Sequence, residues 1–270
     1  MSLINDFSKR AELVEEMDKP DCDQALLYTT LRRFEVTNRL FTRYRTVLRR
    51  HVLNDMRREP ERTYQFTELG AGGCDVARWL VRVCRRENLK ITVRSIDGNP
   101  RTVRYARRLN VGYPEIEVVE ADACDPACWG KPDYLFAQHL LHHLPAAACV
   151  QLLQTLNQIA PRQFIISDLV RSRAAYHAFR IVARPLGVGS FIVDDGCTSI
   201  RRGFLESEIK QMVDAAQMQN PFTTYRLFPS RLVIVGGTRN ATQHPHPNPL
   251  VNCPLLTANC PLPSALCPLP

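Results

Sequence analysis

Long apolar runs are missing from this sequence of 270 residues. No stretch approaches the roughly 18 uninterrupted apolar residues that a membrane span needs. The first residues, MSLINDFSKRAELVEEMD, are amphipathic and acidic, and they lack the basic start and apolar core of a secretory signal peptide. We therefore expect a cytoplasmic protein whose ten cysteines are mostly reduced thiols.

Zinc-ligand spacing is also missing among the cysteines. Cys124 and Cys128 are one helical turn apart, but no second pair stands at a ligand-like distance. Small buried apolar side chains are the simpler interpretation, so the sequence predicts no metal site.

An aromatic-rich stretch that could be a stacking platform for nucleic-acid bases is also missing. The formal net charge of +8 could still indicate an acidic partner. However, the arginines are scattered over several predicted helices, with the densest group at 43–58. A solvated helix face is the simplest interpretation, and a lid over an anionic substrate is an alternative.

Two kinds of pattern divide the chain. Residues 3–18 and 21–58 have apolar side chains at helical spacing, with Asp21 or Asp23 as the N-cap of the second helix. From residue 62 onward, strand and helix patterns alternate, which indicates a mostly parallel sheet covered by helices. The strands are predicted at 64–69, 91–96, 116–120, 134–138 and 163–169, and the helices at 74–88, 99–109, 146–159 and 205–218.

The last two predicted strands, 222–228 and 231–235, are joined by a tight corner and should form an antiparallel hairpin at one edge. The predicted fold class is therefore α/β, with a Rossmann-like, mostly parallel sheet, an antiparallel C-terminal hairpin and an N-terminal helical extension. We divide the chain into the extension at 1–60, a sheet domain at 61–239 and a proline-rich tail at 240–270 that we expect to be disordered. Within the domain, an insertion at 171–204 follows the fifth strand and is placed to cover a substrate.

The strongest motif is ELGAGGCD, from Glu68 to Asp75, between a strand and a helix. Its glycines allow a sharp turn and a close approach of a ligand to the backbone. A dinucleotide fingerprint would need glycine at 75. A carboxylate at Glu68 suits a cationic ligand better than a pyrophosphate.

Two further carboxylates follow the next strands. Asp97, in IDGNP, can accept hydrogen bonds from both hydroxyls of a ribose, and capping the following helix is the alternative role. Asp122, in EADACD, can accept a hydrogen bond from an adenine amino group or be a solvated turn residue.

Histidines cluster after the fourth strand, in AQHLLHHL. A histidine there can remove a proton from an acceptor near neutral pH, and His139 and His142 are the predicted catalytic residues. His143 is a further candidate, and any one of the three could instead pack or cap.

Together, ELGAGG, IDGNP, EADACD and AQHLLHHL resemble the successive motifs of class I methyltransferases that depend on S-adenosylmethionine (SAM). The L-H-H-L segment is similar to that of the ubiquinone/menaquinone-type group. The N-terminal helices and the DDG-containing insertion resemble those of methyltransferases found beside type III polyketide synthases, which implies a phenolic or polyketide-like acceptor. Cys74 departs from the pattern, because many relatives have a third glycine there.

The resemblance implies SAM as the cofactor, with the methionine end, the ribose and the adenine held in turn by Glu68, Gly70, Ala71, Gly72, Gln138, Asp97, Gly98, Asp122 and Ala123. Acceptor contacts are predicted from the insertion, at Tyr176, His177, Arg180, Asp194 and Arg201. Asp194, Asp195 and Gly196 could equally be a surface turn.

The predicted function is methyl transfer to a small-molecule acceptor. A nucleic-acid or protein methyltransferase is an alternative, but Gln138-His139-Leu140-Leu141 differs from the Asn/Asp-Pro-Pro-aromatic segment typical of enzymes that methylate nucleic-acid amines. A third hypothesis is a non-catalytic SAM-binding protein. Residues 21–58 fit either a cover over the active site or a contact with a second copy in a homodimer.

Overall fold

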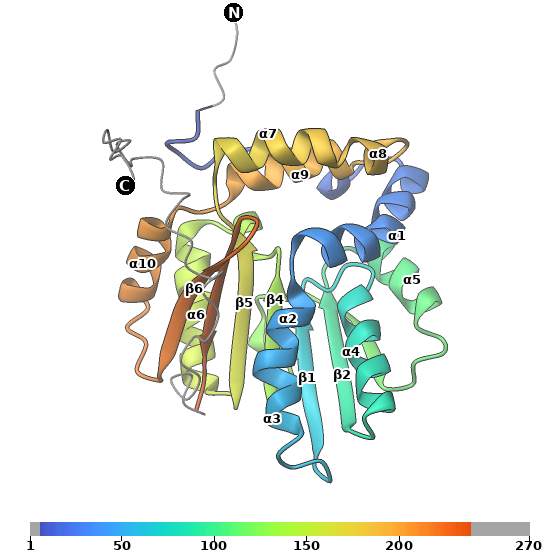
Figure 1. Ribbon diagram of the computed structural model, residues 1–270, viewed down its shortest axis with the longest axis vertical. Helices are drawn as coiled ribbons and strands as arrows, with labels where there is room; N and C mark the ends of the chain where they lie inside the picture. The colour runs from blue at the N-terminus through green and yellow to red at the C-terminus, as the bar shows by residue number, and fades with distance from the viewer. Residues whose placement is uncertain (1–5, 239–270) are drawn as a thin grey trace, which may run out of the picture.

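The computed structural model describes residues 6–238, and its centre is a seven-stranded sheet (Figure 1). The strand order is β3-β2-β1-β4-β5-β7-β6, in which β1 to β5 are parallel and β7 runs antiparallel to both β5 and β6. The fold class and the edge hairpin predicted from the sequence are confirmed. The strands are β1 Thr63–Leu69, β2 Lys90–Asp97, β3 Ile116–Glu120, β4 Tyr134–Gln138, β5 Gln163–Leu169, β6 Phe222–Leu227 and β7 Arg231–Gly236.

Helices cover both faces of this sheet, and further helices lie over one end of its strands (Figure 1). One face packs against α2 Tyr44–Leu48, the π-helical turn Arg49–Leu53, α3 Asn54–Met56, α4 Asp75–Arg86 and α5 Pro100–Leu109. The other face packs against α6 Ala146–Ile159 and α10 Glu206–Ala215. Successive side chains of a buried strand point to opposite faces of the sheet. On β4, Phe136 packs in the apolar core on the face of α4, whereas Leu135 packs in the core on the face of α6.

The first predicted helix, at 3–18, is wrong over the described residues. Residues 6–15 are not helical, and only a short 3₁₀ turn, η1 Glu16–Asp18, follows. Tertiary hydrogen bonds replace helical ones here, since the amide of Ala11 donates to Arg201 O and Arg10 Nη2 donates to the carbonyls of His142 and Leu144. An amphipathic pattern alone could not reveal these distant partners.

The second predicted helix, at 21–58, is broken. α1 Gln24–Phe41 begins at Asp23, whose carboxylate accepts a hydrogen bond from the amide of Leu26, as a helix N-cap does. It ends where Arg43 adopts a left-handed conformation with φ 55°. The break allows α1 to lie across the upper end of the sheet while α2 and α3 descend along its face (Figure 1). One straight helix could not occupy both places.

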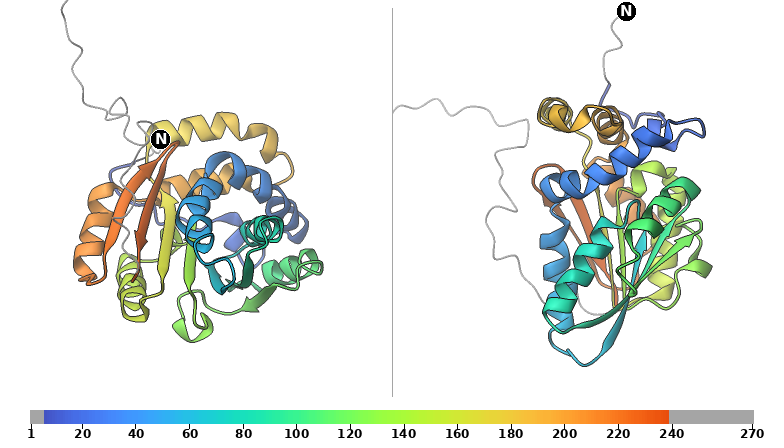
Figure 2. Two further views of the ribbon diagram at one scale, coloured as in Figure 1. Left: turned by 60° about the horizontal axis from the view of Figure 1, so that its bottom comes forward. Right: turned by 90° about the vertical axis from the view of Figure 1, so that its right-hand side faces the viewer.

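The insertion at 171–204 forms three helices, α7 Arg173–Val182, α8 Arg184–Gly187 and α9 Ile192–Arg202. They lie across the end of the sheet at which β5 ends, beside α1, in both views of Figure 2. Arg33 on α1 donates a hydrogen bond to Leu186 O at 2.7 Å, and Phe191 N donates to the hydroxyl of Thr30 at 2.9 Å. These three helices are called the cap below.

Asp194, Asp195 and Gly196 do not form a surface turn, because they belong to α9. A Cβ atom at Gly196 would collide with the ring of Phe179 on α7, so the missing side chain permits close packing of the two helices. The buried carboxylate of Asp195 accepts hydrogen bonds from the amides of Glu16 and Met17. Its role is to hold the N-terminal segment.

No helix among residues 6–238 is both long and apolar enough to cross a bilayer. The disorder expected for residues 240–270 concerns a segment outside the described residues.

Candidate functional site

The glycine-rich turn after β1 is built from left-handed residues. Gly70 and Gly72 have φ values of 66° and 52°, and Cys74 has a φ of 57°. The amide of Cys74 donates to Ala71 O at 2.8 Å, which closes the turn directly before α4. The third left-handed position therefore exists, but a cysteine occupies it where glycine would be unstrained.

Asp97 joins this turn to the end of β2. Its Oδ2 accepts a hydrogen bond from the amide of Gly72 at 2.8 Å, and its Oδ1 accepts one from the amide of Asn99 at 2.9 Å. Burial raises the pKa of Asp97, and these two amides oppose that effect. Each carboxylate oxygen can accept a second hydrogen bond, and the half-buried side chain remains accessible to a ligand.

Glu68 lies beneath the turn and is 4% exposed. Burial, helped by the negative charges of Asp75 and Asp97, raises the pKa of this carboxyl to about 8, against the hydrogen bond that Ser95 donates to it at 3.2 Å. A buried acid of this kind can bind a cation by releasing its proton.

The other predicted cofactor residues lie at the same end of the sheet. Gln138 ends β4 and is buried, and its Oε1 has no hydrogen-bond partner among the described residues. Asp122 is exposed beyond β3 and accepts a hydrogen bond from the amide of Cys124, while Ala123 is buried. Gly98 follows Asp97 at the end of β2 and is exposed.

His139 has a left-handed φ of 56° and lies beside Arg231, whose Nη1 is 3.0 Å from His139 Nε2 and 3.3 Å from Nδ1. Burial and the positive charge of Arg231 lower the pKa of His139 well below its usual range. The imidazole is therefore neutral at pH 7. A non-glycine residue in this conformation stores strain, as is common where a backbone is shaped for function.

His142 is almost fully buried between two carboxylates. Its Nδ1 lies 2.7 Å from Asp168 Oδ1, and its Nε2 lies 3.4 Å from Glu15 Oε1. Burial opposes protonation, but Asp168 and Glu15 outweigh it and raise the pKa of His142 to about 9. The nearby charge of His142 holds the pKa of Asp168 below its usual range despite burial. His142 is thus protonated at neutral pH and is poorly suited to remove a proton.

His143 is the neighbouring ring, with its side chain 27% exposed. Its Nδ1 lies 3.0 Å from Asp18 Oδ2, and its Nε2 lies 3.8 Å from Glu15 Oε1. Sequence reasoning missed Glu15, Asp18, Asp168 and Arg231. Asp168 ends a predicted parallel strand and could have been found by that position, whereas Glu15 gave no signal because its partners lie more than 120 residues away.

The structure does not gather the predicted acceptor residues at one point. Tyr176 is buried, and its ring packs edge-on against Phe7 with centroids 5.5 Å apart. His177, Arg180 and Asp194 are exposed on the cap. Arg201 is half-buried, and its Nε has no hydrogen-bond partner among the described residues.

A cavity of about 370 Å³ lies elsewhere, beside the middle of β1 and β2, and its lining includes Gln65, Arg94 and Trp129. None of the predicted site residues lines it.

No protein-family model matches the chain, and no curated protein matches it by sequence. Solved structures do match it. A SAM dependent methyltransferase from Aquifex aeolicus is 14% identical, with a TM-score of 0.53, over 77% of this chain and 97% of the other. The plantazolicin methyltransferase BamL, solved with a triazolic desmethylPZN analog and SAH, is 12% identical, with a TM-score of 0.52, over 83% and 88% of the two chains.

Human N-acetylserotonin methyltransferase, solved with SAM, is 13% identical, with a TM-score of 0.52. The match covers 81% of this chain but only 57% of the human one. At these identities the likeness is one of fold. The seven-stranded sheet, with its parallel centre and antiparallel edge, is thus the Rossmann-like fold of these SAM-dependent methyltransferases.

Proposed function

We propose that this protein transfers a methyl group from SAM to a small-molecule acceptor. The observation that carries the proposal is the contact between Asp97 and the amide of Gly72, at 2.8 Å. It holds the β2 carboxylate against the β1 turn at the carboxyl ends of parallel strands, where such sheets bind their ligands. The remaining acceptor sites of Asp97 suit the two hydroxyls of a ribose.

The neighbouring groups fit the methionine end of SAM. Gln138 Oε1 is buried without a partner, and Glu68 is a buried acid with a raised pKa. A buried, unpaired acceptor is costly, and an ammonium group would satisfy both side chains. Asp122 and Ala123, beyond β3, would lie toward the adenine.

When bound, SAM supplies a methyl group carried on a positively charged sulfur. The chain's own part is to orient the acceptor and exclude water, and such positioning provides much of the acceleration in transfer reactions. The cap and residues 6–19 lie over the strand ends and would form the acceptor site. Of the two predicted catalytic histidines, only His139 is neutral, and its lowered pKa makes it a weak base, whereas His142 is already protonated.

We infer that the acceptor is a phenolic or polyketide-like compound, methylated on oxygen or on an activated carbon. This inference rests on the motif resemblance and on the cap.

Calorimetric titration with SAM tests the cofactor. The wild type should bind, and Asp97→Ala should bind at least about 100-fold more weakly, because two hydrogen bonds to a charged group are worth about 3 kcal/mol or more. Glu120→Ala is the matched control, since Glu120 is the exposed register partner of Asp97 on β3. Equal binding by all three proteins would refute the assignment of Asp97.

Turnover is tested separately by incubating the wild type with SAM and a panel of phenols. Formation of S-adenosylhomocysteine and a methylated product, both detected by mass spectrometry, is the expected result. Tight SAM binding without any methylated product across phenols, other small molecules, RNA and proteins would favour a binding protein instead.

A further inference from the structure

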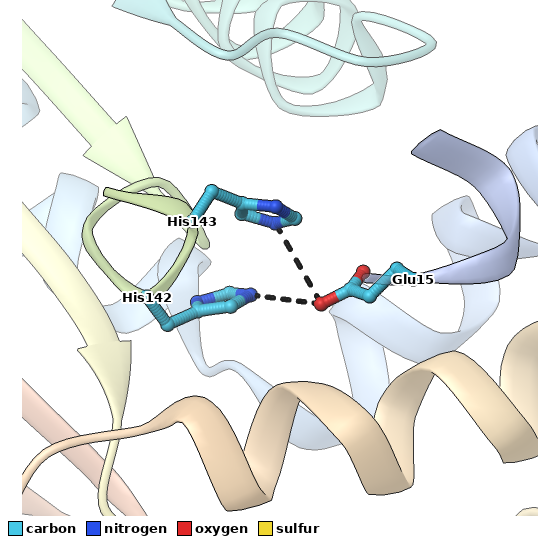
Figure 3. A group of neighbouring side chains, drawn as sticks. All are labelled: Glu15, His142 and His143. Carbon is cyan, nitrogen blue, oxygen red and sulfur yellow. Dashed lines mark ion pairs between the residues drawn. The ribbon is translucent and has the colours of Figure 1, made fainter. Parts of the chain in front are cut away.

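Three potential metal ligands converge on one point beside the end of β4. Glu15 Oε1, His142 Nε2 and His143 Nε2 come from two segments far apart in the sequence, and the three atoms lie within 4.8 Å of one another (Figure 3). His142 and His143 belong to the 3₁₀ turn η4 Leu141–His143, and Glu15 directly precedes η1. Figure 3 shows both rings directed at the same carboxylate oxygen.

The separations suit an ion better than direct hydrogen bonds. Glu15 Oε1 is 3.4 Å from His142 Nε2 and 3.8 Å from His143 Nε2, whereas a charged N–H···O bond is normally about 2.7–2.9 Å long. Zinc binds such ligands at about 2.0–2.1 Å in tetrahedral geometry, which places neighbouring ligand atoms about 3.3 Å apart. The two separations from Glu15 Oε1 are within about 0.5 Å of that value, and the ligand atoms of all three residues lie within 4.8 Å of one another.

Each imidazole is oriented by a second carboxylate on its far side. His142 Nδ1 lies 2.7 Å from Asp168 Oδ1, and His143 Nδ1 lies 3.0 Å from Asp18 Oδ2. Metal-bound histidines almost always donate their other ring N–H in this way, which fixes the tautomer and exposes the ligating nitrogen. The hydroxyl of Ser199 also donates to Glu15 Oε1, at 2.7 Å.

Several carboxylates lie close to the cluster. Glu15, Asp18 and Asp168 surround the two rings, and Asp195 approaches Glu15 from α9. Arg10 and Arg202 both donate to the backbone carbonyl of His142, and Arg231 lies near Asp168 and His139. A divalent cation would replace the proton on His142 Nε2, because a ligating imidazole nitrogen must give up its proton, and both Nδ1 bonds would stay intact.

We propose that Glu15, His142 and His143 bind a divalent transition-metal ion, with Zn²⁺ as the first candidate. Two imidazoles and one carboxylate are a recurring ligand set for zinc and for ferrous iron. Three protein ligands leave a fourth position, and the partly exposed ring of His143 marks the side open to water or an acceptor oxygen. The ion would fasten residues 6–19 to the end of β4. This proposal does not depend on methyl transfer, and the spacing of the cysteines gives no indication of it because none of them is a ligand.

Metal binding by the full chain tests the proposal. Protein stripped with a chelator is titrated with Zn²⁺ in competition with a chromogenic chelator, and separately with Co²⁺ and with Fe²⁺ under anaerobic conditions. The expected result is one Zn²⁺ bound per chain and a visible Co²⁺ absorption typical of tetrahedral nitrogen and oxygen ligands. An intense thiolate-to-cobalt charge-transfer band would assign the ion to the cysteines and overturn the proposal.

Two variants and a control locate the ion. His143→Ala removes a partly exposed ligand and should lower the Zn²⁺ affinity by more than 100-fold, while Asp18→Asn, acting through His143, should lower it roughly 10–100-fold. His177→Ala removes an exposed histidine on the cap and should leave binding unchanged. Circular dichroism establishes that each variant is folded. Absence of Zn²⁺ binding by the wild type, or undiminished binding by folded His143→Ala, would show that the cluster is only a hydrogen-bonded network.

Discussion

The proton on Glu68 should make the stability of the protein fall as the pH rises. The carboxyl has a pKa of about 8 in the folded state, compared with about 4.3 in an unfolded chain. Between these values the folded protein holds a proton that the unfolded chain has lost. This contribution to the free energy of unfolding is therefore full below about pH 4 and decreases through pH 8, by about 1.4 kcal/mol per pH unit.

Glu68→Gln isolates this effect, because the amide resembles the protonated acid and does not ionise. Urea unfolding of both proteins without ligand, at pH 5, 6 and 7, should show the variant gaining about 2–3 kcal/mol over the wild type between the two ends of this range. Other titrating groups are common to both proteins and cancel in the difference. A difference that stays constant with pH would refute the raised pKa.

The same proton links pH to the proposed cofactor. If the ammonium of SAM replaces it, binding at pH 6.5 should release about one proton, which calorimetry in buffers of different ionisation enthalpy measures. The SAM dissociation constant should then fall about tenfold from pH 6 to pH 7 in the wild type, and stay nearly constant in Glu68→Gln.

Three other predictions concern stability and local order. Cys74→Gly should be about 1 kcal/mol more stable than Cys74→Ala, because position 74 is left-handed; equal urea midpoints would contradict this. Gln138→Leu should raise the thermal midpoint without ligand, by removing an unpaired buried oxygen, and should reduce the further rise that SAM causes; a lower midpoint would count against the unpaired oxygen. Asp195→Ala should speed tryptic cleavage after Arg10, because the amides of Glu16 and Met17 lose their acceptor; cleavage at the wild-type rate would show that other contacts hold this segment.

Most of the sheet could be predicted from the sequence because its strands and helices have local signatures. β3, β4, β5 and α6 begin and end where the apolar patterns place them, and the hairpin of β6 and β7 follows from its short corner. The failures occur where tertiary contacts override local pattern. The amphipathic stretch before residue 16 is held extended by bonds to Arg201 and His142, and the helix after residue 21 breaks at Arg43.

The candidate site divides in the same way. Glu68, Asp97 and Gln138 were predictable because each lies at the end of a strand, and parallel strands bring their ends together. The environment of His142 could not be predicted, because its pKa depends on Glu15, which lies more than 120 residues earlier in the sequence. Motif reasoning therefore located this histidine but could not establish its protonation state.

The attachment of residues 10–18 to the cap and the η4 turn also sets an order for folding during synthesis. These residues leave the ribosome well before their partners, among them His142, Asp195 and Arg201, which are made 120 or more residues later. At about 5–20 residues per second, the segment waits for many seconds beside a growing sheet. This segment is therefore made long before it can reach its place, and it must stay soluble in the interval, which its acidic and polar composition favours.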